Sequence, residues 1–423
     1  MARRLIYTAI FVAVFGTYVF RAWDNGSLTS LPEPGDGADY DTIAFNVWQG
    51  RGFGFDWDDP EWRKPYLQDP GHEGMLTRHS DYYPTTYRPP AVPILMGLVY
   101  TLTNRSFAAW RIVECALMAG AVTIAAVVSA GIAGLPAAVL TAILALQSED
   151  LTVYSQQFMT EAMATLMVTL LAWLWLRHSK NGWTLKRAVG LGVALGVLIA
   201  TRSIFVLWLP VALFVPRLST SKGVKALLVP KAACVLGCLL IAGPWWVRNV
   251  VVTRALMPFG TEGALNMPVG FGPRALRAEG VWHSNREDGS DEMWARYQPD
   301  LRKFELELAK YRQRLSLRWM RGHPGDVVRL MWMHVRQEIK PHGSPFVDSL
   351  LYLAGAAALL FRRSPAVKVV ALMLCANLFG IALTWSVEGR FMVPLQPLLI
   401  ALVGAMAAVV VRQGMRVLDR VEA

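Results

Sequence analysis

The sequence is poor in charged residues and in cysteine. Charged side chains make up only 17% of its 423 residues and hydrophobic ones 54%, a balance that excludes an ordinary soluble domain and is typical of a membrane protein. The four cysteines lie inside apolar stretches without paired spacing, which argues against structural disulfides and zinc sites. GxSxG, Walker and GxGxxG motifs are missing, and the pair Gly192-x-x-x-Gly196 predicts close packing of two spans rather than a phosphate loop.

The positive charge is spread along the chain. The formal net charge is +11 and the pI is about 9.6, and the basic residues stand at the ends of apolar runs. This pattern is typical of topology signals and lipid-headgroup contacts, and it argues against nucleic-acid binding. The histidines lack the spacing of a zinc site. Acidic loop residues could hold Mg²⁺ or Mn²⁺, but no spacing forces two carboxylates together, so we expect no required metal or other cofactor.

Ten apolar runs are candidates for membrane spans. The first follows Arg3 and Arg4 and has no small-x-small cleavage site after it, so we expect an uncleaved anchor rather than a signal peptide. Several of the others are short for the ~20 residues that usually cross a bilayer. The runs cover residues 5–22, 107–130, 134–148, 161–176, 187–201, 203–216, 226–247, 346–361, 367–386 and 391–411.

An eleventh apolar stretch, 89–103, decides the topology. If it does not span, and Arg3 and Arg4 keep the N-terminus inside, four short basic loops all face the cytoplasm, as the positive-inside rule requires. If it does span, all four face outward. We therefore predict about ten spans in a multi-pass cell-membrane protein with both termini in the cytoplasm and with 89–103 re-entrant or interfacial. The basic loops are 177–187, 217–225, 362–368 and 412–423.

This topology gathers the unusual polar segments on the outer, extracytoplasmic face. We predict a single all-α integral membrane domain, 1–423, with a first outer loop at 23–106 and a long fourth outer loop at 248–345. Amphipathic patterns within these two loops predict helices that lie parallel to the membrane. The patterns cover 39–50 in the first loop, and in the long loop Phe304, Leu308, Tyr311, Leu315 and Trp319, followed by Val327, Leu330, Met331 and His334.

Three aspartates, Asp36, Asp39 and Asp41, crowd the start of the first outer loop. A carboxylate that is partly desolvated at the membrane interface can have a raised pKa and serve as a general base, which typically contributes ~10²–10⁴ in rate. The alternative is that Asp36 or Asp39 caps the N-terminus of the following helix. The residues alone leave both open.

Glu161 and Arg202 are charged residues at the edge of the membrane. Glu161 opens the fourth predicted span, where a carboxylate either caps the helix beside Thr160 or acts in a site at membrane depth. Arg202 lies between two short apolar runs, which predicts a broken helix or a tight hinge. An arginine at that depth needs an anion, and a lipid phosphate is the natural one.

Arg88, Arg248 and Arg390 occupy similar positions at the outer boundary. Two of them have an ordinary explanation, because Arg248 can snorkel to lipid headgroups and Arg390 can pair with Glu388. Together with Arg202, however, four arginines converge on one face, and this favours a shared anion site.

Six segments, taken in order, resemble the GT-C superfamily of membrane glycosyltransferases that use polyprenyl-phosphate sugars. The resemblance is to the family 39-like branch near protein O-mannosyltransferases and lipid A aminoarabinose transferases, and it spans the whole chain. GT-C enzymes are helical bundles with membrane-parallel helices in the first outer loop, which agrees with the topology predicted above. The segments are GDGADYDTIAFNVWQGRGF, TTYRPPAVP, YSQQFMTEAM, GVALGVLIATRS, PWWVRN and EGRFMVPLQP.

The resemblance implies roles for particular residues. Asp36, four residues before Tyr40, would be the general base on an acceptor hydroxyl or phosphate; the acceptor would then attack the anomeric carbon and polyprenyl phosphate would leave, with inversion. Arginines would stabilise the leaving phosphate, and Glu161 would hold the acceptor or the sugar. The predicted substrate-binding set is Asp39, Tyr40, Arg88, Glu161, Arg202, Arg248, Glu388 and Arg390.

The sequence departs from the family pattern in two places. Gly37 follows Asp36, where the family has Glu directly after its catalytic Asp, so Asp39 and Asp41 stay open as the base. A large extracytoplasmic C-terminal domain is lacking, so we expect acceptor selection in the two outer loops or in a partner protein.

We therefore expect a glycosyltransferase, either a hexosyl- or a pentosyltransferase, that moves a sugar from a polyprenyl-phosphate donor to a glycan, lipid or protein acceptor. Its other partners would be membrane lipids. The main alternative is a flippase or transporter of lipid-linked sugars, which would also use arginines against a lipid phosphate. A transporter is expected to have matching halves and polar residues on both sides of the midplane, whereas here they lie on one face. A non-catalytic assembly subunit is the third hypothesis.

Overall fold

The chain folds almost entirely into helices. The computed structural model describes all residues except 1, 70–75, 217–222, 285–288, 298–299 and 422–423, so the predicted basic loop 217–225 lies largely outside the described residues. One small antiparallel sheet pairs β1 (Gly54–Phe55) with β2 (Tyr83–Pro84). The helices are α1 (Ala2–Asp24), η1 (Ser27–Thr29), α2 (Asp36–Trp48), α3 (Pro60–Arg63), η2 (Tyr66–Gln68), α5 (Ala91–Thr103), α6 (Phe107–Ala133), α7 (Leu135–Ala145), α8 (Glu149–Tyr154), α9 (Glu161–Asn181), α10 (Leu185–Thr201), η4 (Ser203–Phe214), α11 (Gly223–Thr253), α12 (Glu262–Leu265), α13 (Met267–Gly270), α14 (Pro273–Arg277), α15 (Ser290–Tyr297), α16 (Leu301–Gly322), α17 (Pro324–Ile339), α18 (Pro345–Leu360), α19 (Pro365–Ala382), η5 (Arg390–Leu395) and α20 (Gln396–Val421).

Every apolar run predicted to span the membrane forms a helix. Among the described residues, five helical segments are long and apolar enough to cross a membrane: α1, α6, α11, α19 and the continuous segment from η5 into α20. The shorter apolar helices are α5, α7, η4 and α18. The number of crossings and the side on which the termini lie stay predictions.

The run at 203–216 differs from the expected α-helix, because it forms the 12-residue 3₁₀ helix η4 with Pro210 inside it. Proline lacks the N–H that an interior α-helical position donates. A 3₁₀ helix rises ~2.0 Å per residue against 1.5 Å for an α-helix, so 12 residues reach roughly 24 Å rather than 18 Å. The larger rise per residue therefore makes this short helix longer, and its length comes closer to the ~30 Å thickness of a hydrocarbon core.

Glycines bring α10 and α11 into backbone contact. A Cβ added at Gly192 would lie 1.9 Å from the Cys234 carbonyl oxygen, and one at Gly237 would lie 2.3 Å from that of Val189. Gly196 also packs against the facing backbone, because its Cβ would be 2.7 Å from the Cys238 carbonyl oxygen. The prediction that Gly192-x-x-x-Gly196 packs two helices together is confirmed.

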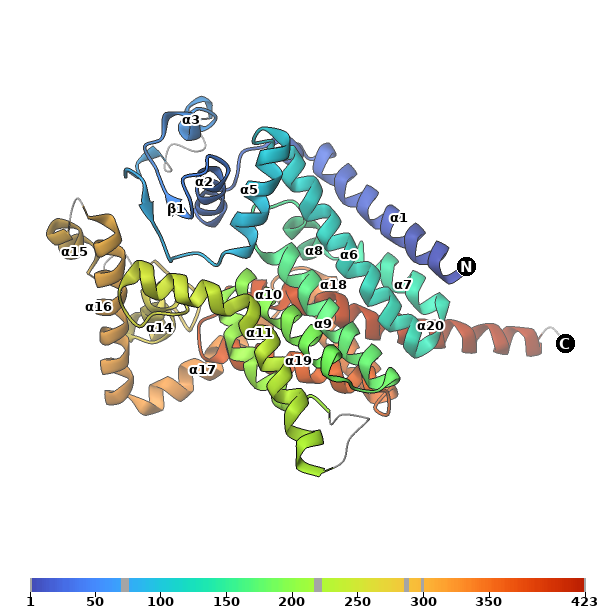
Figure 1. Cartoon of the computed structure of the whole chain (residues 1–423). Coiled ribbons are helices and arrows are strands. Elements are labelled where there is room, and N and C mark those ends of the chain that lie inside the picture. Colours follow the sequence, from blue (N-terminus) through green and yellow to red (C-terminus); the bar gives the residue numbers. More distant parts are fainter. Residues whose placement is uncertain (1, 70–75, 217–222, 285–288, 298–299, 422–423) are drawn as a thin grey trace.

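The two outer loops lie at one end of the molecule. In Figure 1, α2, α3, α15 and α16 lie on the left, whereas both chain termini lie on the right. Arg412 of α20 donates a hydrogen bond to the carbonyl of Ala133, where α6 turns into α7. The basic end of α20 and this turn therefore share one end of the bundle, away from the outer loops.

The first amphipathic helix begins earlier than predicted, at Asp36 rather than residue 39, and ends at Trp48. Gly35 precedes it with φ +93°, a conformation that glycine adopts without strain. The stretch 89–103, which was predicted not to span, contains the 13-residue helix α5, which packs on α2 so closely that a Cβ at Gly97 would lie 3.1 Å from the Ala44 carbonyl oxygen.

The apolar stripe predicted on α16 is partly buried. Leu308 is buried, Phe304, Tyr311 and Trp319 are half-buried, and Leu315 is 38% exposed. The buried side of the helix also carries polar residues, which bind neighbouring loops. The buried residues of α16 are Glu305, Leu308, Ala309, Arg312 and Ser316. On α17, Leu330 and His334 are buried as predicted, and Val327 and Met331 are half-buried.

Candidate active site

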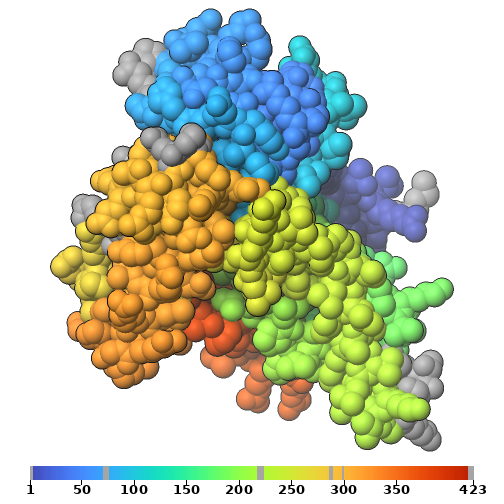
Figure 2. Space-filling model, turned by 60° about the vertical axis from the view of Figure 1, so that its left-hand side comes forward, coloured from blue at the N-terminus to red at the C-terminus, as the bar shows by residue number. Residues whose placement is uncertain are grey.

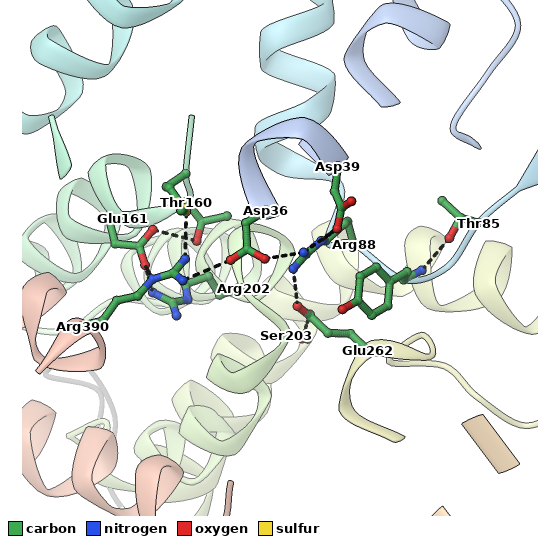
Figure 3. A network of polar contacts seen from close by, with 12 residues as sticks. Asp36, Asp39, Thr85, Arg88, Thr160, Glu161, Arg202, Ser203, Glu262 and Arg390 are labelled. Carbon is green, nitrogen blue, oxygen red and sulfur yellow. Dashed lines mark hydrogen bonds and ion pairs between the residues drawn. The ribbon is translucent and has the colours of Figure 1, made fainter. Parts of the chain in front are cut away.

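Seven charged residues from distant parts of the chain form one network where the first outer loop meets the long outer loop and the ends of α9 and α10 (Figure 3). We call this the central network. All seven lie in segments that the topology argument placed on a common face, and the structure brings them together. The residues are Asp36, Asp39, Arg88, Glu161, Arg202, Glu262 and Arg390.

Asp36 stands between two arginines. Arg88 Nη2 lies 2.5 Å from Oδ1 of Asp36, and Arg390 Nη1 lies 3.1 Å from Oδ2. Burial alone would raise the pKa of Asp36, but the two guanidinium groups hold it well below its usual value. The expected raised pKa is therefore wrong. The position of Asp36 in the first turn of α2 further favours the carboxylate over the neutral acid.

Asp36 is the most accessible member of the central network. Its side chain keeps 30% of its exposure, against 19% for Glu262 and 0% for Glu161. The guanidinium groups beside it are more enclosed, with 6% for Arg88 and 17% for Arg390. A molecule that enters the site can therefore reach Asp36 before it reaches the other carboxylates.

Arg88 joins three carboxylates. Its Nε and Nη2 lie 3.0 and 2.6 Å from Asp39 Oδ2, and its Nη1 lies 3.0 Å from Glu262 Oε1. The aromatic rings of Tyr40 and Tyr87 flank the guanidinium group at 5.2 and 4.5 Å. These contacts fix the orientation of Arg88, so that its guanidinium group faces Asp36.

Glu161 binds the other two arginines. Its Oε1 accepts hydrogen bonds from Arg202 Nη1, at 2.9 Å, and from Arg390 Nε. The Arg202 guanidinium also stacks over the Phe391 ring at 4.8 Å. No side-chain capping hydrogen bond occurs at the start of α2 or of α9, so the capping alternative for Asp36, Asp39 and Glu161 is wrong.

A groove runs from the central network between α10 and α11. Its enclosed part measures only about 20 Å³, room for about one water molecule, and the rest of its space is open to solvent. Apolar side chains such as Ile199, Trp245 and Trp246 line its length, while Arg88, Ser203 and Glu262 lie at its polar part. Figure 2 shows in addition a hollow between the yellow-green surface of α11 and the orange surface of α16 and α17, two helices that contribute no residue to this lining.

Two predicted site residues lie outside the central network. Glu388 is 52% exposed on its side chain and pairs with Lys340 at 3.3 Å, so the expected pairing with Arg390 is wrong. Arg248 contacts no carboxylate of the network and binds backbone, with Nη1 2.5 Å from the Thr85 carbonyl and Nη2 2.8 Å from that of Phe53. Arg248 therefore supports the segment before Arg88.

Asp41 is enclosed away from the site. Its oxygens accept hydrogen bonds at 2.6 to 2.7 Å from four side chains, and its own side chain is 0% exposed. These hydrogen bonds connect α2 to the rest of the first outer loop. The four donors are Trp62, Tyr66, Tyr100 and Arg105.

Sequence reasoning missed Glu262 and Arg78. Glu262 lies in the middle of the long loop without a flanking motif, and it reaches the site by binding Arg88 and, at 2.9 Å, Ser203 Oγ. Burial raises its pKa, opposed by Arg88. Arg78 closes on Asp39 at 2.7 Å. No periodicity or spacing in the sequence connects either residue to Asp36.

The described part of the chain contains no group of three or more His, Cys, Asp or Glu side chains arranged to hold a metal ion. The carboxylates of the central network are paired with guanidinium groups instead.

No protein-family model matches the sequence, and no curated protein sequence matches it. Solved structures do match. Two crystal structures of ArnT from Cupriavidus metallidurans, one bound to undecaprenyl phosphate and one in the apo state, have TM-scores of 0.43 and 0.42 at 15% identity. The matches cover 94% of this chain and 77% and 76% of theirs.

The archaeal oligosaccharyltransferase AglB from Archaeoglobus fulgidus, in complex with an inhibitory peptide and a dolichol-phosphate, has a TM-score of 0.50 at 13% identity. This match covers 99% of the chain described here and 52% of AglB. At such low identity, the match shows a shared architecture. The chain therefore shares the all-α fold of this membrane protein.

Proposed function

We propose that the protein is a membrane glycosyltransferase that moves one sugar from a polyprenyl-phosphate donor to an acceptor on the extracytoplasmic side, with inversion. One observation carries this proposal: Asp36 is the most exposed carboxylate of the central network and lies between Arg88 and Arg390. A base beside two cations suits a reaction in which one group loses a proton while a phosphate leaves.

The lining of the pocket between α10 and α11 supports a lipid donor. Apolar side chains lie beside Arg88 and Ser203, next to Arg202, so a phosphate and the start of an isoprenoid chain would each meet a suitable surface at its mouth. A guanidinium group has five N–H donors, and among the described contacts Arg202 donates one hydrogen bond, to Glu161. Arg202 therefore has donors left for a phosphate. AglB, which shares the fold, was solved with a dolichol-phosphate.

In the proposed reaction, Asp36 takes the proton of the acceptor hydroxyl. The acceptor oxygen forms a bond to the anomeric carbon, and the bond from that carbon to the phosphate oxygen breaks with its electron pair going to the phosphate. Arg88, Arg202 and Arg390 stabilise the charge on the departing polyprenyl phosphate. Arg88 and Arg390 then contact the phosphate as well as Asp36, which weakens their hold on Asp36 and makes it a stronger base.

Single-turnover release of polyprenyl phosphate tests the proposal. A panel of polyprenyl-phosphate sugars, with candidate glycan, lipid and peptide acceptors, is supplied to membranes that contain wild type, Asp36→Asn or Asp81→Asn. Asp81 is an exposed aspartate of the same loop and serves as the control. We expect release by wild type and by Asp81→Asn, and loss of release in Asp36→Asn with donor binding retained.

Donor binding without release under every acceptor would contradict the transferase. If the donor instead crossed the bilayer with its sugar attached, a lipid-linked-sugar transporter would replace it. We also propose that no divalent metal takes part, so release should be unchanged by EDTA and by added Mg²⁺ or Mn²⁺. The identity of the sugar and of the acceptor follows from the same panel.

A further inference from the structure

Two glutamates of the long outer loop are buried and form no ion pair within the described part of the chain. Glu305 on α16 is 9% exposed and Glu338 on α17 is 2% exposed. A buried carboxylate without a compensating partner is costly. Both residues accept hydrogen bonds from other segments instead, and those segments carry the arginines of the central network.

Glu305 binds the segment that leads to Arg88. Its Oε1 accepts hydrogen bonds from the Thr86 N–H at 3.1 Å and from the Thr86 and Thr261 hydroxyls at 3.2 and 2.6 Å, and its Oε2 accepts one from the Thr85 hydroxyl at 2.6 Å. Arg88 follows Thr86 by two residues, and Glu262, which binds Arg88, follows Thr261 directly. Glu305 thus fixes the segment before Arg88 and the segment before its partner Glu262 relative to each other.

Glu338 binds the segment that carries Arg390. Its Oε2 accepts hydrogen bonds from the Ser386 hydroxyl at 2.7 Å and the Val387 N–H at 3.0 Å, and its Oε1 accepts one from the Phe391 N–H at 2.5 Å. Ser386 is also bonded through its backbone to Gly280 and Trp282. The residues after Ser386, which bend through positive φ at Glu388 and Gly389, depend on Glu338.

The two glutamates therefore act on the two arginines that flank Asp36. We infer that Glu305 and Glu338 are positioning residues, which fix Arg88 and Arg390 at the distance from Asp36 that the reaction requires. This inference rests on the proposed function. The long outer loop touches neither Asp36 nor the apolar part of the groove through these residues, yet it determines how the phosphate end of the site is built.

The hydrogen-bond patterns predict different responses to an amide. Glu305 accepts one backbone N–H, and its other partners are hydroxyl groups, which can accept as well as donate. Glu305→Gln can keep these contacts. Glu338 accepts backbone N–H groups on both oxygens, so in Glu338→Gln one N–H must face the amide NH₂. Gln should therefore rescue position 305 but not position 338.

The test uses the full-length protein with Ala and Gln at each position and Glu307→Ala as the matched control. Glu307 lies on the same helix, is partly exposed and pairs with Lys310. Hydrogen exchange of the backbone amides, followed by mass spectrometry of peptides over 84–92 and 385–393, reports the two segments directly. Single-turnover release, measured from acid to neutral pH, reports the site.

We expect Glu305→Ala to speed exchange at 85–88 alone and Glu338→Ala to speed it at 386–391 alone. Release should fall about 10²-fold, the loss typical of a catalytic group misplaced by ~1 Å. The acid limb of the pH profile should move to higher pH, because an arginine that drifts from Asp36 no longer holds its pKa down. Partial unfolding would lower the rate without moving this limb.

Unchanged exchange in both Ala variants, an equal effect of Glu307→Ala, or a rate loss without a shift of the acid limb would overturn the inference. So would equal rescue by Gln at both positions. If wild type releases no polyprenyl phosphate from any donor, the proposed function fails, whereas segment-specific exchange still decides whether the two glutamates hold their loops.

Discussion

Two aspartates on α2, Asp36 and Asp41, have opposite surroundings. Asp36 keeps 30% of its side-chain exposure and is bound by arginines from two distant segments, with Arg88 and Arg390 at 2.5 and 3.1 Å. Asp41 is 0% exposed and is bound by four donors that all lie between residues 62 and 105. The same residue type on one short helix therefore serves two purposes.

The difference shows how a carboxylate that is available for a reaction can be told from one that only stabilises the fold. Around Asp41, tyrosine and tryptophan donors with a nearby arginine satisfy the carboxylate completely, which rigidifies the first outer loop. Around Asp36, the partners are cations from different parts of the chain, and one side stays accessible. Charge and accessibility together favour Asp36 as the reacting group, which the clustering of three aspartates in the sequence left undecided.

The largest effect expected on activity comes from Asp36→Asn. Removing the proposed base should lower kcat by ~10²–10⁴. The fold should persist, because Arg88 keeps Asp39 and Glu262, and Arg390 keeps Glu161. Turnover of the active donor and thermal unfolding of the purified protein provide the two measurements. A large fall in Tm would show that Asp36, like Asp41, is needed for the stability of the fold.

Asp41→Asn should give the reverse result. The amide leaves Arg105, whose side chain is 7% exposed, without its counter-charge, and breaking such a buried pair typically costs ~3–5 kcal/mol. Denaturation in detergent should show this loss, while any folded protein keeps its kcat. An intact Tm with lost turnover would erase the contrast between the two aspartates.

Arg390→Gln should move the pH dependence. The pKa of Asp36 is held low in the folded protein, so the ionised base, and the stability that its ion pairs add, are present above the unfolded carboxyl pKa of ~3.9 and are lost as the pH falls through the lower folded value. Without one guanidinium, the acid limb of the rate profile should lie at higher pH. An unmoved limb would mean that Arg88 alone sets this pKa or that Asp36 is not the base.

The smallest effect is expected from Glu388→Gln. Glu388 lies two residues from Arg390 in the sequence but pairs with Lys340 on the surface, and exposed pairs contribute about 0–1 kcal/mol. Neither release of polyprenyl phosphate nor Tm should change measurably. A clear loss of turnover would show that Glu388 acts at the site, and exposure and charge pairing would then no longer distinguish the reacting carboxylate from the others.

Much of the architecture can be predicted from the sequence, because apolar runs report burial in lipid directly. The runs, the hinge at Arg202 and the Gly192-x-x-x-Gly196 contact needed no knowledge of partners. Loop charge placed Arg88, Glu161 and Arg390 on the same face as Asp36, and the family resemblance implied that they share one site.

The remaining site residues were hidden for a physical reason. Glu262 and Glu305 take their roles from side chains more than 40 residues away, and hydrophobic periodicity assigns a charged residue on a helix to solvent. On α16, this rule found the stripe of Leu308 and Leu315 but not the adjoining side with Glu305 and Arg312, whose polar groups are buried against other loops. The direction of the pKa shift at Asp36 also could not be predicted from the sequence, because it depends on which cations lie closest to the carboxylate.

The contact between Asp36 and Arg390 joins residues 354 positions apart in the sequence. Because a chain is made and inserted from its N-terminus, the base exists long before the arginine that completes its surroundings. A nascent chain that has inserted its early helices therefore lacks a finished site until the segment that leads into α20 has left the ribosome. Activity would then appear in one step, when that segment is in place.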